Sequence, residues 1–137
     1  MTRYHCRVRN AVNFAYELLP QSGSVCVYCG CPADSVDHVP PINVVHSLGV
    51  ENLRKQGIRL WAIPACRECN TILSYDNGLT VEDRKKELKR KLKRRYKRYL
   101  KVAHWGTEEM EDVGPTIRRF IDDGYSVKAW ITERLKW

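Results

Sequence analysis

No run of apolar residues in this sequence reaches the roughly 18 residues that a membrane-spanning helix needs, so we expect no membrane partner. The opening residues, MTRYHCRVRN, carry charges, and no apolar segment follows them, so a secretory signal peptide is not expected either. The sequence has no internal repeat and no low-complexity tract beyond one basic run. These absences favour a cytoplasmic protein.

The length of 137 residues and the hydrophobic content of 43% fit one compact domain with one or two helical additions. Six cysteines are present. Disulfides are not expected, because there is no export signal and the chain is long enough to form a core without them. Metal binding or simple burial is the favoured interpretation of the cysteines.

The net charge of +8 is concentrated in one segment. Residues 1–83 carry 7 basic and 8 acidic groups, residues 84–101 carry 12 and 1, and residues 102–137 carry 5 and 7. Such a patch is typical of a protein that binds a polyanion, although a solvated helix face is the alternative. The predicted nucleic-acid-binding residues are Lys89, Arg90, Lys93, Arg94 and Lys97.

Apolar periodicity predicts a helix over residues 7–19, packed on the core and ended by Pro20. Short strands are expected at residues 36–39 and 58–63, with a loop or short helix at residues 43–48. A further short helix should follow Cys66 and end near residue 78.

Thr80 is a predicted N-cap, and the basic helix that it begins should continue to about His104. Two short helices joined at Gly124 are expected in the tail. A helix, a glycine turn and a helix can form a DNA-reading unit, but the tail is slightly acidic. Packing or dimerisation is therefore the favoured role of the tail.

Two Cys-x-x-Cys pairs, Cys26/Cys29 and Cys66/Cys69, provide four thiolates that can form a tetrahedral shell around one Zn²⁺. The alternatives are a thioredoxin-type redox pair and four buried thiols, but no βαβ pattern accompanies the pairs. A four-thiolate site is closed, so the predicted zinc is structural. Cys6 and Cys31 are spare, and exchange of Cys31 for Cys29 as a ligand stays open.

Asp37 and His38 lie between the two cysteine pairs, and Asn70 follows the last cysteine directly. Each residue alone is more often a surface or capping residue. The order in which they occur is more specific: a cysteine pair, then Val-Asp-His-Val-Pro, then a strand, then Cys-x-x-Cys-Asn at the start of a helix. This order resembles the zinc-bound branch of the HNH endonucleases, over roughly residues 26–77.

The resemblance implies a ββα-metal core in which Asp37 and Asn70 ligate a catalytic Mg²⁺ or Mn²⁺ and His38 is the general base. Oxygen ligands suit these cations, and an imidazole can accept a proton from water at neutral pH. Neighbouring residues on a regular strand face opposite ways, so Asp37 and His38 converge only where the strand ends or is distorted. The break at residues 40–41 supplies a reason for such a distortion.

Two departures from the family pattern concern substrate positioning. The middle asparagine of the family usually precedes the second cysteine pair closely, whereas the nearest candidates here, Asn52 and Asn43, are far from it. The lysine that often follows Cys-x-x-Cys-Asn is absent from residues 71–74. His46 is a candidate phosphate contact, although a loop histidine without a role is the favoured interpretation.

The sequence thus predicts an α+β protein: a ββα-metal (HNH) core with a structural zinc, an N-terminal helix, a long basic helix and a small helical tail. The expected segments are residues 1–23, 24–78, 79–104 and 105–137. The expected function is metal-dependent endonuclease cleavage of duplex, nicked or branched DNA. The resemblance implies a phage or mobile-element protein in the cytoplasm of a bacterial host. The expected partners besides DNA are a second copy of the chain or a larger phage assembly.

Two other interpretations of the chain stay open. One is a non-catalytic, zinc-stabilised nucleic-acid-binding module. The other is a structural component of a phage or ribonucleoprotein assembly that docks through the basic helix. Cleavage that depends on Mg²⁺ and on His38 would separate the endonuclease from both.

Overall fold

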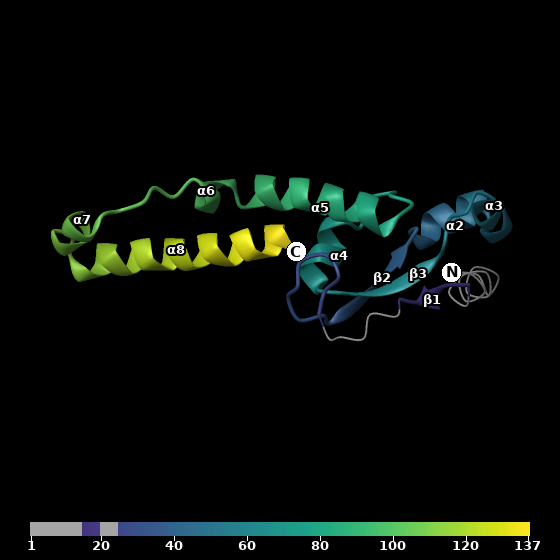
Figure 1. The fold of residues 1–137 in the computed structure, drawn as a ribbon, viewed down its shortest axis with the longest axis horizontal. Helices are drawn as coiled ribbons and strands as arrows, with labels where there is room; N and C mark the ends of the chain where they lie inside the picture. Colours follow the sequence, from purple (N-terminus) through teal and green to yellow (C-terminus); the bar gives the residue numbers. More distant parts are fainter. Residues whose placement is uncertain (1–14, 20–24) are drawn as a thin grey trace, which may run out of the picture. The chain divides into compact units, whose positions relative to one another are not determined.

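The computed structural model describes residues 15–19 and 25–137 (Figure 1). They form a mixed α+β structure with one small sheet and a series of helices. The chain divides into two compact units, Met1–Leu88 and Lys89–Trp137, here called the N-terminal unit and the C-terminal unit. Within the described residues, no helix combines the length and the apolar character that crossing a membrane requires.

The sheet of the N-terminal unit has three strands in the order β1-β3-β2. β2 (Ser35–Val39) pairs antiparallel with β3 (Trp61–Ala65), and β1 (Glu17–Leu18) pairs parallel with β3. Side chains alternate along β2, so Asp37 and Val39 are buried while Val36 is exposed. β2 ends before two prolines, which cannot donate hydrogen bonds to a partner strand.

Two short helices, α2 (Ile42–Leu48) and α3 (Val50–Lys55), follow β2 and are separated by Gly49. Gly49 has a φ of 84°, a left-handed conformation that glycine adopts without steric cost. The two helices and the start of β3 enclose a small apolar cluster formed by Val45, Leu53 and Leu60.

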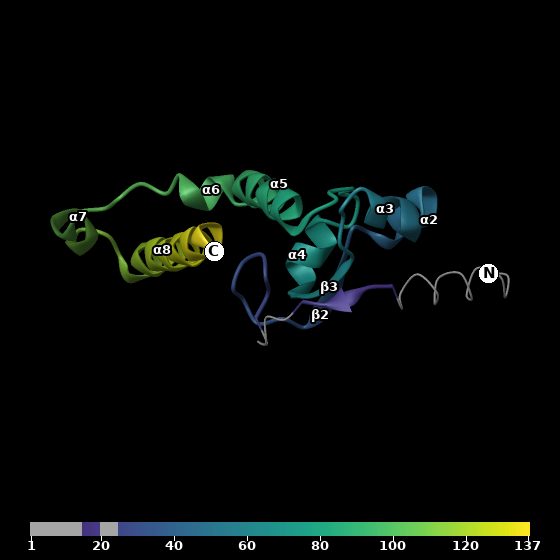
Figure 2. The same ribbon diagram turned by 45° about the vertical axis from the view of Figure 1, so that its right-hand side comes forward.

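α4 (Arg67–Ile72) packs against β2, and Figures 1 and 2 show it across one face of the β2–β3 pair. α5 (Val81–Arg95) follows, and the division between the two units lies within it. Thr80 caps α5 as predicted, since its hydroxyl oxygen accepts a hydrogen bond from the backbone N–H of Asp83 at 3.1 Å.

The C-terminal unit contains α6 (Lys97–Leu100), α7 (Thr107–Glu111) and α8 (Pro115–Lys136). α6 packs against α8, and the ring of Tyr96 meets that of Trp130 edge to face at 5.8 Å. α8 is amphipathic, with Ile121 and Ile131 buried. A Cβ at Gly124 would lie 3.8 Å from the Val102 side chain, an ordinary van der Waals distance, and α8 continues through this glycine.

The structure confirms the mixed α+β class, the strand at residues 36–39 and the helix at residues 43–48. The predicted helix over residues 7–19 lies mostly outside the described residues. Its end was wrongly predicted, because Glu17 and Leu18 form β1. The backbone N–H of Glu17 donates to the carbonyl of Leu60 at 2.9 Å, and this pairing with the sheet replaces helical hydrogen bonds.

Other boundaries also differ from the prediction. β3 begins at Trp61, not at residue 58, and α4 ends at Ile72, well before residue 78. The basic helix ends at Arg95 and restarts as α6, and α3 and α7 were not expected. The prediction of two tail helices joined at Gly124 was wrong, because α8 is continuous there.

Candidate functional site

The four cysteines of the two Cys-x-x-Cys pairs come together in the N-terminal unit, as predicted. The sulfur atoms of Cys26, Cys29, Cys66 and Cys69 all lie within 4.8 Å of one another. The four residues are almost completely buried, from 0% to 8% exposed. Four close thiols of this kind could hold a metal ion such as zinc.

Local backbone geometry explains how each pair is presented. After Cys26 the chain makes a tight turn through Gly30, which has a φ of 71° and donates its N–H to the Cys26 carbonyl at 2.9 Å. Cys66 caps the N-terminus of α4, and its sulfur accepts the backbone N–H of Cys69 at 3.4 Å. A backbone hydrogen bond from Val27 to the carbonyl of Pro64, at 3.0 Å, joins the two turns.

Crowding changes the acidity of these thiols. The hydrogen bond with Cys29 is the largest cause that raises the pKa of Cys26, which reaches about 11. The pKa of Cys69 is raised first by its hydrogen bond with Cys26 and next by that with Cys29. Four thiolates this close would repel one another, so a cation among them is what would favour their ionised form.

The remaining cysteines lie outside this group. Cys31 is partly buried and accepts the backbone N–H of Cys26 through its carbonyl at 2.7 Å, but its sulfur is not part of the cluster. Cys29 therefore occupies the position for which Cys31 was the alternative ligand. Cys6 lies outside the described residues.

The Asp37 carboxylate is buried and bound to Arg84, which is the first basic residue of α5. Nη2 of Arg84 lies 3.0 Å from Oδ1 and 2.8 Å from Oδ2 of Asp37, and Nε lies 3.1 Å from Oδ2. The hydroxyl of Tyr28 donates to Oδ2 at 2.5 Å, and the backbone N–H of His38 donates to Oδ1 at 2.9 Å. Both oxygens of Asp37 therefore already accept several hydrogen bonds.

Arg84 is 1% exposed and has a second acidic neighbour. Its Nη1 donates to the carbonyl of Asp76 at 2.8 Å and lies 3.5 Å from the Asp76 carboxylate. Burial acts to lower the pKa of Arg84, but the charge of Asp37 and the contact with Tyr28 outweigh it and raise the pKa. Burial, and next the charge of Asp37, raise the pKa of Tyr28, so its hydroxyl keeps its proton and remains a donor.

His38 points away from Asp37, because successive side chains of β2 face opposite sides of the sheet. Its ring contacts the ring of Tyr16 edge to face at 4.8 Å, and the Tyr16 hydroxyl donates to the carbonyl of Pro40. Burial lowers the pKa of His38, and the charge of Asp37 only partly opposes this. The imidazole is therefore mainly uncharged at neutral pH and keeps a nitrogen lone pair available.

Asn70 lies on α4 and is tied to β2. Its amide nitrogen donates to the carbonyl of Val36 at 3.2 Å and to the hydroxyl of Ser35 at 3.3 Å. The three residues of the predicted catalytic site therefore lie on or against one strand. Asp37 contacts Arg84 and His38 contacts Tyr16, on the two opposite faces that neighbouring residues of a strand present.

The arrangement around Asp37 does not fit a divalent cation while Arg84 is bound there. A cation ligand must offer an oxygen lone pair, and the hydrogen bonds from Arg84, Tyr28 and the His38 backbone use those of Asp37. Across residues 15–19 and 25–137, the four cysteines are the sole group of three or more His, Cys, Asp or Glu side chains with metal-binding spacing. The assignment of Asp37 and Asn70 as cation ligands stays a prediction.

The candidates for the middle asparagine of the family, Asn52 and Asn43, and the candidate phosphate contact, His46, lie on the two short helices after β2. Asn52 is on α3, where its side-chain oxygen accepts a hydrogen bond from Gln56 at 3.3 Å. Asn43 and His46 are exposed on α2. Among the described residues, none of the three forms a hydrogen bond with Asp37, Arg84 or Asn70.

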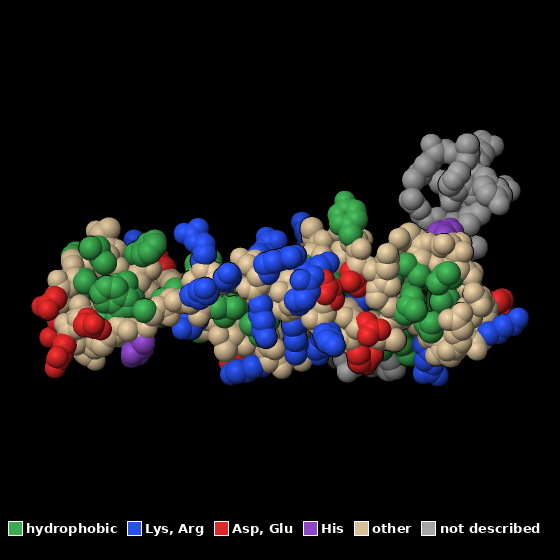
Figure 3. Space-filling model, turned by 90° about the horizontal axis from the view of Figure 1, so that it is seen from above, with side chains coloured by type: hydrophobic (Ala, Val, Ile, Leu, Met, Phe, Trp, Pro, Cys, Tyr) green, Lys and Arg blue, Asp and Glu red, His purple; other side chains and the backbone are tan. Residues whose placement is uncertain are grey.

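The basic segment, residues 85–101, forms an accessible surface along α5 and α6. Figure 3 shows Lys and Arg side chains gathered along this part of the chain. Of the five predicted nucleic-acid-binding residues, four are exposed and Lys89 is partly buried. Leu88 and Leu92 are fully buried on the opposite side of α5, which leaves the charged side chains outward.

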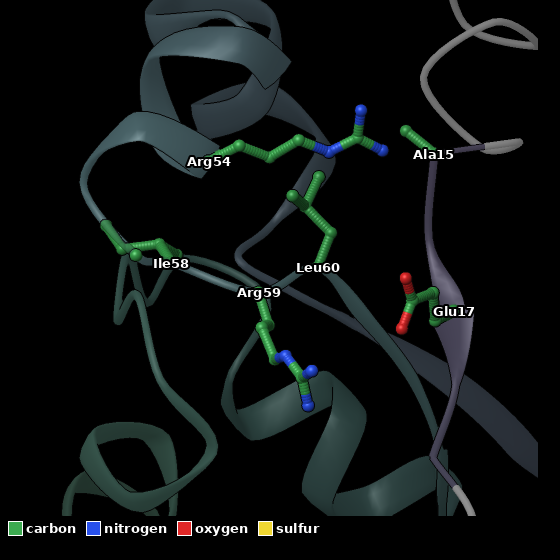
Figure 4. A pocket seen from close by; sticks show the side chains of 7 residues that line it. Ala15, Glu17, Arg54, Ile58, Arg59 and Leu60 are labelled. Atoms are coloured by element: carbon green, nitrogen blue, oxygen red, sulfur yellow. The ribbon is translucent and has the colours of Figure 1, made fainter.

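A pocket of about 300 Å³ lies elsewhere in the N-terminal unit, between β1, the end of α3 and the start of β3. Figure 4 shows Glu17, Arg54 and Arg59 among its lining residues. The lining has charges of both signs, and none of the predicted site residues belongs to it.

Comparison with known proteins adds no relative: no family model, no curated protein and no solved structure matches the chain.

Sequence reasoning missed Arg84 and Tyr28. Arg84 was counted with the basic segment, although it lies four and eight residues before Leu88 and Leu92. That spacing places Arg84 on the buried face of α5. Tyr28 lies inside the first Cys-x-x-Cys pair, next to two of the four clustered cysteines, and its side chain is fully buried. The helical periodicity could have marked Arg84 as buried, and the position between two clustered cysteines could have marked Tyr28.

Proposed function

We propose that this chain is a zinc-stabilised nucleic-acid-binding protein that contacts the phosphate backbone through α5 and α6. One observation carries this proposal. Of the 12 Lys and Arg residues in residues 84–101, Arg84 is buried in an ion pair and the other 11 are exposed or partly exposed.

Charge density is the physical reason to prefer nucleic acid as the partner. The segment contains a single acidic residue, Glu87, so the repulsion among its cations is hardly relieved within the segment itself. Phosphates spaced along a nucleic acid would neutralise several of these cations at once and release condensed counterions. A solvated helix face would be expected to alternate the two signs of charge.

The four-cysteine cluster supports the zinc part of the proposal. A Zn²⁺ held by Cys26, Cys29, Cys66 and Cys69 would join the turn before β2 to the start of α4. Such a site contributes folding free energy on the order of 10 kcal/mol, which a small three-stranded sheet cannot easily supply by apolar burial.

Charge reversal tests the binding surface. Lys93→Glu/Arg94→Glu should weaken binding to duplex DNA at least ten-fold in a fluorescence anisotropy titration, because two exposed cations of α5 become anions. Arg118→Glu/Arg119→Glu is the matched control, since it makes the same change in net charge on exposed residues of α8. Equal loss in both variants would mean that net charge alone, and not the α5–α6 surface, determines binding.

A second candidate function is hydrolysis of the nucleic-acid backbone, as the resemblance to HNH endonucleases implies. The observation in its favour is His38. It lies on β2 next to Asp37, and its lowered pKa leaves the imidazole able to accept a proton from water at neutral pH. The resemblance assigns the catalytic Mg²⁺ or Mn²⁺ to Asp37 and Asn70, whereas Arg84 is bound to Asp37 in the structure.

Cleavage of supercoiled plasmid in the presence of Mg²⁺, Mn²⁺ or EDTA tests the second candidate. His38→Ala should lower a metal-dependent cleavage rate about 10²- to 10⁴-fold, while DNA affinity and zinc content stay the same. His46→Ala is the matched control, because His46 is an exposed histidine on α2. Absence of cleavage of duplex, single-stranded and branched DNA by the wild-type protein would leave the binding function alone.

A further inference from the structure

We propose that Arg84 is an internal counter-cation for a buried oxygen site at Asp37, and that Arg84 and a divalent cation exclude one another there. The site is formed by the side chains of Asp37, Asp76 and Tyr28 together with two backbone carbonyls. Arg84 enters it from the first turn of α5.

The hydrogen-bond acceptors around the Arg84 guanidinium are carboxylate, carbonyl and hydroxyl oxygens. Nη1 of Arg84 faces the Asp76 carbonyl at 2.8 Å and the Asp76 carboxylate at 3.5 Å. Nη2 faces both oxygens of Asp37 and, at 3.5 Å, the carbonyl of Leu73. Carboxylate and carbonyl oxygens are also the ligands that hard divalent cations prefer. The same oxygen atoms that accept hydrogen bonds from Arg84 are therefore chemically suited to bind Mn²⁺ or Mg²⁺.

Because the site is buried, it can hold either the Arg84 guanidinium or a divalent cation, but not both at once. The side chains of Arg84 and Asp37 are 2% and 8% exposed, so a charge left alone there would be strongly unfavourable. With Arg84 present, one guanidinium and two carboxylates share the site, and Asp37 has no remaining lone pair for a metal. Without the positive charge of Arg84, two carboxylates would face each other and would bind a cation more tightly.

The loop before α5 closes over Arg84 and limits the space for both occupants together. A Cβ added at Gly78 would lie 2.8 Å from Cγ of Arg84 and 2.8 Å from the Asp76 carboxylate, so this glycine permits the backbone to pass directly over the ion pair. The backbone N–H of Gly78 donates to the Asp76 carboxylate at 3.0 Å and fixes that side chain beside Arg84.

The proposal goes beyond nucleic-acid binding and concerns the site that the second candidate function would use. It does not require cleavage, because occupancy by a metal is measured directly. Failure to cleave DNA would therefore count against hydrolysis and leave the competition at Asp37 to be decided separately.

Mn²⁺ binding to the zinc-loaded full chain, followed by electron paramagnetic resonance, tests the proposal. Arg84→Gln should bind one Mn²⁺ at least ten-fold more tightly than the wild type, and the added Asp37→Asn change should abolish the gain. Arg84→Lys is the matched control, because it keeps the positive charge and should bind Mn²⁺ as weakly as the wild type. Equal binding by Arg84→Gln and the wild type, or binding that survives Asp37→Asn, would overturn the proposal.

A thermal measurement keeps the test decisive if Arg84→Gln is unstable. Mn²⁺ should raise the Tm of Arg84→Gln, because a ligand that binds the folded state stabilises it by mass action. The Tm of Asp37→Asn/Arg84→Gln should not respond. An equal response of the two variants to Mn²⁺ contradicts the proposal, as does a wild-type protein that binds Mn²⁺ tightly through Asp37.

Discussion

The two units of this chain are stabilised in different ways. The N-terminal unit combines an apolar core, which includes Val45, Leu53 and Leu60, with two specific contacts: four clustered thiols and a buried ion pair between Arg84 and Asp37. The described part of the C-terminal unit depends on helix packing, with Ile121 and Ile131 inside and large apolar side chains such as Phe120, 81% exposed, outside. Losing one contact should therefore disrupt the first unit as a whole, whereas packing in the second should weaken by increments.

The largest expected difference between the units follows removal of one thiol. Cys69→Ser should lose the zinc and unfold the N-terminal unit, because structural zinc sites in small domains contribute about 10 to 16 kcal/mol of apparent binding free energy. Metal analysis and circular dichroism measure both effects. Cys31→Ser makes the same chemical change outside the cluster and should keep one zinc per chain. A Cys69→Ser protein with full zinc content would show that the cluster is not a metal site.

The next largest effect concerns the buried ion pair. Asp37→Asn should destabilise the N-terminal unit by about 3 to 5 kcal/mol, because it removes the carboxylate closest to the buried Arg84 and leaves Asp76, at 3.5 Å, as its acidic neighbour. Urea unfolding measures the change in free energy. Glu51→Gln is the control, since it breaks an exposed pair with Arg54 that should contribute about 0 to 1 kcal/mol. If the two substitutions change the free energy of unfolding equally, the buried ion pair contributes no more than an exposed one.

The stability of the C-terminal unit should fall when a buried side chain is shortened and a cavity forms. Ile131→Ala should cost about 2 to 5 kcal/mol, because Ile131 is fully buried and its loss leaves a void. Ile117→Ala, at a position that is 55% exposed on the same helix, should change stability by about 0.5 kcal/mol or less. Loss of helical circular dichroism on heating compares the two. If both variants melt alike, helix packing is not what stabilises this unit.

The smallest expected effect is the titration of His38. Its pKa is lowered by burial, so its NMR chemical shifts should change at a pH below the value of about 6.5 for a free imidazole. The unfolded chain then binds more protons than the folded one, so the His38 contribution to stability should decline as the pH falls through about 6.5. A His38 pKa above that of a free imidazole would contradict the buried position on β2.

Within the N-terminal unit, local motifs could be predicted from the sequence and a long-range pair could not. The four thiol ligands were predicted because each pair is a local motif whose spacing reflects metal geometry. The capping of α5 by Thr80 was equally local. The pairing of Asp37 with Arg84 was not predicted, because 47 residues separate them and each had a different expected role.

The prediction was weaker where tertiary contacts override local preference. Glu17 and Leu18 continue an apolar helical pattern, yet hydrogen bonds to the β3 region make them a strand. Glycine is a frequent helix breaker, but α8 continues through Gly124. Neither outcome can be read from the residues on either side, so the boundaries there required the structure.

If α5 and α6 bind the nucleic-acid backbone, the affinity for duplex DNA should depend strongly on salt concentration. If the surface neutralises about six phosphates, log K should fall with log salt concentration at a slope of about −5. Lys89→Glu/Arg90→Glu/Lys93→Glu/Arg94→Glu should give a much shallower slope and weaker binding to all sequences alike. A wild-type affinity that does not change with salt, or a slope that the four substitutions leave unchanged, would contradict binding of the phosphate backbone by α5 and α6.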